Sequence, residues 1–242
     1  MKLFLPKQHG AWAMLIIPFW LGVIKGGFIW QHIPFFIGWL LLYLATYPML
    51  LLFKRKKISF YSKWTLLYMI PSLLFLLFPL FERPSIIYFG LLMLPFFMIN
   101  AFYTSKNQDR AFMNDLSAVF AFSIAGLASS YLTDGEINFE TIVFTFLTSV
   151  LFFVGCTFYV KTMIREKKNT QFKWISWFYH IMLVLICFGL GVWIVALAFI
   201  PSLLRAIVFY GRSLSPKQIG IYEIINSALF FTISAIQIGI LT

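Results

Sequence analysis

Apolar residues run along the chain in long stretches that short polar and basic segments interrupt. A membrane-spanning helix needs about 20 mostly apolar residues to cross about 30 Å of hydrocarbon, because each residue adds about 1.5 Å. Nine stretches approach this length, with expected bounds Ala11–Val23, Ile33–Phe53, Trp64–Leu80, Ser85–Tyr103, Asp115–Leu132, Thr141–Val160, Trp174–Leu190, Val192–Tyr210 and Ile219–Leu241. The pattern predicts an all-α, polytopic transmembrane bundle that forms a single domain over residues 1–242.

Residues 174–210 allow either one bent helix or two short ones, and the charged residues decide between them. With two spans hinged near Gly189 and Gly191, all Lys and Arg residues except Lys25 and Arg83 fall on one side of the membrane. The cytoplasmic loops of membrane proteins carry an excess of Lys and Arg. We therefore predict nine spans, with the N-terminus in the cytoplasm and the C-terminus outside.

Composition supports a membrane protein and argues against a soluble one. Of the 242 residues, 61% are hydrophobic and only 11% are charged, too few to cover the outside of a soluble fold of this size. The net charge of +11 does not indicate nucleic-acid binding, because the basic residues lie in short gaps between apolar runs. We expect an uncleaved first span, since further apolar runs follow it, and a location in a bacterial cytoplasmic membrane.

No motif for a metal or a cofactor is evident. Cys156 and Cys187 lie within apolar runs, where a free cysteine usually behaves as a small hydrophobe. The sequence has no glycine-rich phosphate loop, no CxxCH motif and no Cys/His spacing typical of a metal site. No metal is expected, and the sequence identifies no cofactor.

Polar residues inside or beside a span are costly in lipid, so their positions indicate where a site lies. Nearly all of them gather at the ends predicted to be cytoplasmic. Gln8 and His9 precede the first span, where an interfacial anchor is the alternative interpretation. A second group is spaced three or four residues apart and would form one polar stripe on a continuous helix, with chance spacing as the alternative; its members are Asn100, Tyr103, Asn107, Arg110 and Asn114.

A third group lies at the end of the sixth span and contains Tyr159, Lys161, Arg165 and Glu166. Its two cations could gather the oxygens of a phosphate or a carboxylate, and a guanidinium suits bidentate contacts. Charge that only sets the topology is the alternative. On the opposite side of the membrane, His32 is expected at the interface.

Three ionisable residues lie within the later predicted spans: His180, Arg205 and Glu223. A buried Arg and a buried Glu near one membrane face are expected to pair with each other or with the second group. Purely structural pairing would explain them. A lined polar cavity explains them as well, because the other polar groups lie at the same depth.

Three segments of the chain resemble the YwiC-like family of membrane proteins from Firmicutes: PKQHGAWAML at residues 6–15, YVKTMIRE at residues 159–166, and LLRAIVFY with the following PKQIGIYEIINSALF through residue 230. The resemblance covers nearly the whole chain. It implies a membrane protein without an established activity. The positions that carry it are Pro6, His9, Gly10, Ala11, Trp12, Arg165, Glu166, Arg205, Gly220 and Glu223.

A weaker resemblance connects the chain with the intramembrane prenyltransferases of the UbiA type, which hold a prenyl diphosphate through magnesium on two carboxylate-rich motifs. One of these motifs reads Asn-x-x-x-Asp-x-x-x-Asp. Here Asn100 is followed by Thr104 and Gln108, so both carboxylates are absent, and magnesium usually requires one or two of them. A metal-independent relative that holds diphosphate on Arg110, Lys161 and Arg165 stays open.

Three functions fit these observations. The first is a cytoplasm-facing intramembrane site for an anionic amphiphile, either an isoprenoid diphosphate or a lipid headgroup, where His9 or His180 would transfer protons if a reaction occurs. The second is a small transporter with His180, Arg205 and Glu223 along its path. The third is a non-catalytic membrane subunit that binds haem or quinone; a haem with two His ligands requires His9 and His180 to face each other. Membrane lipids are the expected partners, and nucleic acid is not.

Overall fold

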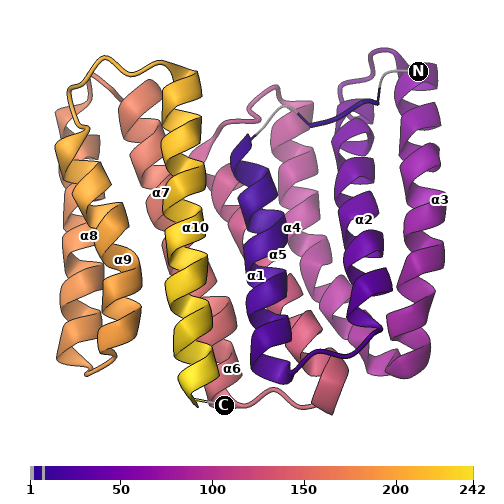
Figure 1. The fold of residues 1–242 in the computed structure, drawn as a ribbon. Coiled ribbons are helices and arrows are strands. Elements are labelled where there is room, and N and C mark those ends of the chain that lie inside the picture. Colours follow the sequence, from indigo (N-terminus) through magenta and orange to yellow (C-terminus); the bar gives the residue numbers. More distant parts are fainter. Residues whose placement is uncertain (1–2, 7–8, 242) are drawn as a thin grey trace.

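The computed structural model describes residues 3–6 and 9–241, and these residues form helical rods that run side by side (Figure 1). The elements are α1 (His9–Gly26), α2 (His32–Leu52), α3 (Ile58–Glu82), the 3-10 turn η1 (Pro84–Ile86), α4 (Ile87–Ser105), α5 (Phe112–Asp134), α6 (Phe139–Thr141), the π-helical η2 (Ile142–Leu147), α7 (Thr148–Ile164), α8 (Thr170–Gly189), α9 (Trp193–Val208) and α10 (Pro216–Leu241). No strand occurs in this described part. The predicted all-α bundle is confirmed.

Seven helical segments are long and apolar enough to cross a membrane, while Gly10–Gly26 and Trp193–Val208 are shorter apolar helices. Large apolar side chains lie exposed on the outside of the bundle, among them Leu73 and Phe178, which are 55% and 67% exposed. A soluble protein of this size rarely exposes so much apolar surface. The chain is therefore a multi-pass helical membrane protein, and the count of nine spans stays a prediction.

The predicted break near Gly189 and Gly191 is confirmed. Helix α8 ends at Gly189, Gly191 adopts a positive φ of 75°, and α9 begins at Trp193. A positive φ strains most residues but not glycine, so the chain can reverse direction in a short turn there. As a result α8 and α9 form an antiparallel pair on one side of the bundle (Figure 1).

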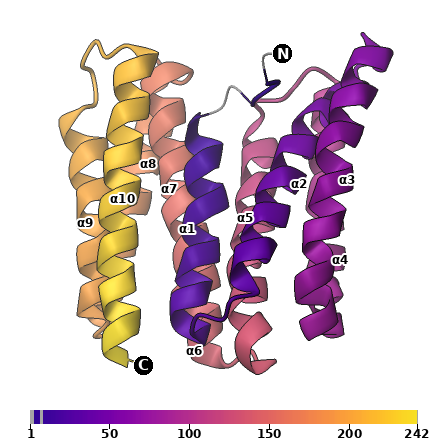
Figure 2. The ribbon, with the colours of Figure 1, turned by 45° about the vertical axis from the view of Figure 1, so that its right-hand side comes forward.

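Helices α1 and α5 lie at the centre of the bundle, with α2–α4 on one side and α7–α10 on the other (Figure 2). Their backbones approach closely at Gly22. A Cβ added to this glycine would lie only 2.0 Å from the carbonyl oxygen of Gly126. Small residues allow this kind of close helix packing in membranes. The other side of α1 contacts α10, so the first and last helices are neighbours.

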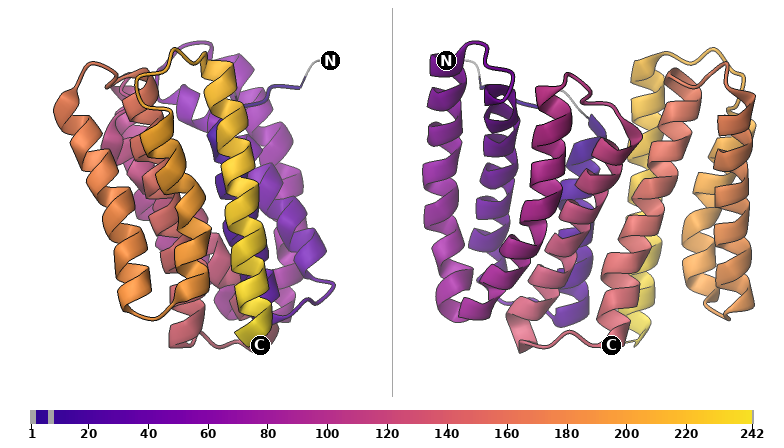
Figure 3. Two further views of the ribbon diagram at one scale, coloured as in Figure 1. Left: turned by 60° about the vertical axis from the view of Figure 1, so that its left-hand side comes forward. Right: turned by 180° about the vertical axis from the view of Figure 1, so that it is seen from behind.

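The loops α2–α3, α4–α5, α7–α8 and α9–α10 lie at one end of the bundle, where α1 also begins (Figure 3). We call it the basic end, because it carries every described Lys and Arg except Lys25 and Arg83. Those two cations have partners at the opposite end: Lys25 forms a 2.7 Å ion pair with Glu140, and Arg83 donates hydrogen bonds to the last carbonyls of α5. A cation near a helix C-terminus is favourable.

His32 begins α2 at the end of the bundle opposite the basic end, and its side chain is buried within the protein, while its expected position at the membrane interface stays a prediction. Its side chain is 0% exposed, its Nε2 donates a 2.8 Å hydrogen bond to the carbonyl oxygen of Ser129, and its Nδ1 accepts one from the Ile29 amide at 3.0 Å. Both ring nitrogens thus have partners within the protein, as buried polar groups usually do. His32 therefore joins α2 to α5.

Candidate functional site

The turn between α4 and α5 brings together part of the second polar group, in a different way from the one predicted. Asn107 has a φ of 58°, and it breaks the helix, so no continuous stripe forms. Instead, the Asn100 amide donates across the turn to the backbone and side-chain oxygens of Asn114, at 2.8 and 2.9 Å, and to Ser117 Oγ at 2.7 Å. Tyr103 packs edge-on against its neighbour Phe102 and takes no part in this network.

Two lysines at the basic end have carboxylate partners. Lys54 forms a 2.6 Å ion pair with Asp109, and Lys161 forms a 2.8 Å pair with Asp115. Lys161 Nζ also donates to the carbonyl oxygen of Arg110 at 2.7 Å. Lys161, predicted to bind an anion, is thus already compensated and holds the α4–α5 loop against α7.

Two arginines at the same end lack such a partner. A hollow of about 330 Å³ is lined by Arg165, which follows α7, and by the whole α4–α5 turn from Asn107 to Ala111. Among the described residues, no carboxylate forms an ion pair with Arg110 or Arg165. Partial desolvation and then the nearby Arg110 guanidinium lower the pKa of Arg165 from its usual value. Two mutually repelling cations over one hollow favour an anion between them.

Glu166 points into the α7–α8 loop instead of the hollow. Its carboxylate accepts a 2.9 Å hydrogen bond from the side-chain amide of Asn169, whose own side-chain oxygen caps α8 by accepting from the Phe172 amide. This arrangement fixes the start of α8. Glu166 is therefore a structural residue of the loop in this structure.

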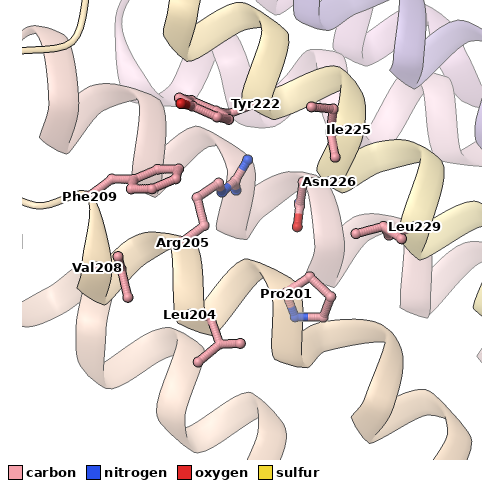
Figure 4. Close-up of a pocket in the computed structure, with 9 residues that line it drawn as sticks. All are labelled: Pro201, Leu204, Arg205, Val208, Phe209, Tyr222, Ile225, Asn226 and Leu229. Atoms are coloured by element: carbon pink, nitrogen blue, oxygen red, sulfur yellow. The ribbon is translucent and has the colours of Figure 1, made fainter.

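A second group of polar side chains lies deeper, among α7, α8, α9 and α10, and Figure 4 draws two of them, Arg205 and Asn226. We call it the buried polar cluster, and its members are Cys156, Tyr159, His180, Ser202, Arg205, Glu223 and Asn226. Arg205 forms an ion pair with Glu223, one of the two arrangements expected from the sequence. Its guanidinium carbon lies 4.0 Å from the centre of the Tyr159 ring, and its Nη2 lies 3.9 Å from Cys156 Sγ. Arg205 is thus the centre of the cluster.

Several atoms of the buried polar cluster have no hydrogen-bond partner among the described residues: Arg205 Nε, Tyr159 Oη and His180 Nε2. A buried donor or acceptor without a partner costs about 1–3 kcal/mol. Native proteins keep few such atoms, and those they keep call for an explanation such as a bound molecule.

His180 does not have the surroundings of a haem ligand. Its Nδ1 donates to the carbonyl oxygen of Ser176 at 2.7 Å, which leaves Nε2 as the free nitrogen. A Cβ added to Gly155 would lie only 3.1 Å from that Nε2, so the α7 backbone fills the space where a flat macrocycle would stack. The haem alternative has no support in this geometry.

The predicted site residues fall into two clusters and not one shared cavity. Helix α7 divides them, since Cys156 and Tyr159 contact Arg205 whereas Lys161 reaches Asp115 and the α4–α5 loop. No hydrogen bond or ion pair described here joins the two clusters. Gln8 lies outside the described residues, and His9 begins α1 at the basic end with a side chain that is also outside them.

Sequence reasoning missed Cys156 and Ser202 as members of the buried polar cluster, and it assigned Tyr159 to the third polar group instead. A signal was present, because three helices each contribute two polar residues three positions apart: Cys156 and Tyr159, Ser202 and Arg205, Glu223 and Asn226. Residues at this spacing share one face of a helix. Such pairs within apolar spans mark the face that turns away from lipid.

The fold and the two clusters define a multi-pass helical membrane protein with its cations at one end. A family profile described as YwiC-like protein matches residues 5–130, and the chain belongs to the YwiC-like family. The chain is 45% identical over 238 residues to a Bacillus subtilis (strain 168) protein named "Uncharacterized protein YwiC", covering 98% of this chain and 99% of that protein. It is 38% identical over 231 residues to an "Uncharacterized protein" of Haemophilus influenzae, covering 96% and 97%. No solved structure matches the chain, and a relationship with UbiA-type enzymes is not shown.

Proposed function

We propose that the protein binds the phosphate-bearing headgroup of an anionic amphiphile at its basic end, which faces the cytoplasm of a bacterial cell. One observation carries the proposal: Arg110 and Arg165 lie over a single hollow without a carboxylate partner. Guanidinium groups bind phosphate oxygens with two parallel hydrogen bonds and stay charged. Asp109 lines the hollow and Asp115 lies near both arginines, but these carboxylates pair with Lys54 and Lys161, so a phosphate or diphosphate would compensate the two arginines.

Two neighbouring lysines at the basic end differ from the arginines, because each of them has a carboxylate partner. Lys54 and Lys161 each have an aspartate within 2.8 Å. Those pairs also fix the loop that carries Arg110, since Lys54 holds Asp109 and Lys161 holds the Arg110 carbonyl oxygen. The two arginines are thus presented by a positioned turn, as expected of a binding site whose groups are preorganised.

An apolar surface for the tail begins close to the two arginines along the chain, since Phe112 follows Arg110 by two residues and Phe158 precedes Arg165 by about two helical turns. Four half-buried rings of α5, α7 and α8 make it up, and we call it the aromatic strip: Phe112, Phe158, Phe172 and Tyr179. The Phe158 ring centre lies 5.2 Å from that of Phe112, 5.8 Å from that of Phe172 and 5.1 Å from that of Tyr179. A charged head above greasy rings suits an isoprenoid phosphate or a phospholipid.

The test uses purified protein in nanodiscs of phosphatidylcholine, with farnesyl diphosphate as one probe and added phosphatidylglycerol as the other. We expect Arg110→Gln/Arg165→Gln to weaken binding at least about tenfold, because hydrogen bonds to charged groups contribute about 1.5–3 kcal/mol each. The control variant Lys56→Gln/Lys217→Gln removes the same charge from exposed positions at the same end.

The two probes distinguish the sources of the headgroup. Preference for farnesyl diphosphate assigns the hollow to isoprenoid phosphates, and preference for phosphatidylglycerol assigns it to membrane lipid. The proposal fails if neither probe binds to the wild-type protein. It also fails if the control variant weakens binding as much as the arginine variant does.

A further inference from the structure

A cavity of about 280 Å³ lies between α9 and α10, away from the hollow at the basic end (Figure 4). Arg205 and Asn226 provide its polar groups, and Phe209, Tyr222, Ile225 and Leu229 are among its apolar walls. Ile225 and Leu229 are 51% and 45% exposed on the outside of the bundle. The mouth of the cavity therefore opens sideways toward lipid.

The inner end of this cavity holds an unused hydrogen-bond donor. The side chain of Arg205 is only 5% exposed, and its Nε has no acceptor among the described residues. The Asn226 side chain and Ser202 bond each other, so each already has one partner. Arg205 Nε has none among the described residues, and an acceptor atom that enters from the membrane and reaches it would satisfy this buried donor.

The charge balance selects the kind of acceptor. Glu223 already compensates the Arg205 guanidinium through the ion pair. A carboxylate or phosphate would bring a second negative charge into a place of low polarity, where an uncompensated charge is costly. A neutral carbonyl oxygen satisfies the free N–H without changing the charge.

We propose that this cavity binds a lipid-soluble quinone, whose carbonyl oxygen accepts the hydrogen bond from Arg205 Nε. Phe209 and Tyr222, whose ring centres lie 4.6 Å apart, both line the cavity and supply an aromatic wall against which a quinone ring can pack. The volume holds a ring but no long chain, so the isoprenoid tail leaves between Ile225 and Leu229 into the lipid. This site is independent of the arginine hollow.

The test measures binding of tritiated decylubiquinone to protein in nanodiscs by scintillation proximity. Ile225→Phe narrows the cavity without touching the ion pair, and we expect at least about tenfold weaker binding. Ile224→Phe is the matched control, because the neighbouring side chain is 59% exposed and does not line the cavity. We expect its affinity to stay within about twofold of wild type.

Further arms examine the donor and the independence of the site. Arg205→Met/Glu223→Gln removes the donor while keeping the interior neutral, and we expect it to lose binding. Arg110→Gln/Arg165→Gln should bind the quinone with wild-type affinity, whether or not its binding of farnesyl diphosphate or phosphatidylglycerol changes. The proposal is overturned if the wild-type protein does not bind decylubiquinone, or if Ile225→Phe and Ile224→Phe bind it with equal affinity. It is also overturned if Arg205→Met/Glu223→Gln binds it with wild-type affinity. Displacement of the labelled quinone by decanoate more strongly than by unlabelled decylubiquinone would overturn it as well.

Discussion

Arg205 and Glu223 form an ion pair between α9 and α10 that is almost fully withdrawn from the surface, with side chains 5% and 12% exposed. Removal of one partner from such a pair typically costs about 3–5 kcal/mol, because the other charge stays buried alone. We therefore expect Glu223→Ala to lower the thermal unfolding temperature of the detergent-purified protein strongly. Arg205→Met/Glu223→Gln should be clearly more stable than Glu223→Ala. Equal losses in both variants would contradict this account of the pair.

The close approach of α1 and α5 predicts a position that tolerates no added methyl group. Gly22→Ala would place a Cβ 2.0 Å from the Gly126 carbonyl oxygen, so the two backbones must separate. Overpacking of this kind costs about 1–3 kcal/mol. Gly90→Ala is the control, since nothing lies within 4 Å of its added Cβ. Thermal unfolding should show a loss for Gly22→Ala alone, and a similar stability of both variants would argue against the tight contact.

The amide of Asn100 holds the α4–α5 turn through three hydrogen bonds. Asn100→Ala should lower the free energy of unfolding by about 1–3 kcal/mol, because buried acceptors lose their donor. The same change should weaken phosphate binding, since the turn carries Arg110. Ser105→Ala provides a comparison with only one exposed hydrogen bond at risk. If the two variants unfold at the same temperature, the Asn100 network does not position the turn.

The two proposed sites should respond differently to salt. Ionic strength screens exposed charges, and the screening length falls from about 10 Å at 0.1 M to about 3 Å at 1 M. Binding of farnesyl diphosphate near Arg110 and Arg165 should therefore weaken steadily as sodium chloride rises. Binding of decylubiquinone should change little, because the ligand is uncharged and its proposed donor is a buried guanidinium that Glu223 already compensates. An unchanged phosphate affinity in 1 M salt would remove the role assigned to the two guanidinium groups.

The orientation of the bundle can be read by labelling with a membrane-impermeant maleimide after both native cysteines are replaced by alanine. Lys106→Cys and Lys168→Cys lie in loops of the basic end, and Glu136→Cys lies at the opposite end. In intact cells we expect label on Glu136→Cys alone, because cationic loops stay in the cytoplasm. Disrupted cells should label all three. Label on Lys106→Cys and Lys168→Cys from opposite sides would refute the basic end itself.

The sequence predicted the positions of the helices within a few residues at most of their ends, since membrane helices require long apolar runs. It also predicted the Gly191 reversal. It could not predict the left-handed turn at Asn107, because periodic spacing continued through a segment whose backbone leaves the helix. The sequence also predicted one polar cavity where the structure has two clusters. The depth of a residue along a helix can be predicted from sequence, but the side of α7 that each side chain faces depends on the packing of the neighbouring helices.

The contact between α1 and α10 has a consequence for biogenesis. Helix α1 is synthesised well before α10, so one of its sides stays uncovered until α10 has been made. Until then that side of α1 contacts lipid or an insertion factor. Nascent chains that stop before α10 should therefore be poor in native packing and accessible to quality-control proteases.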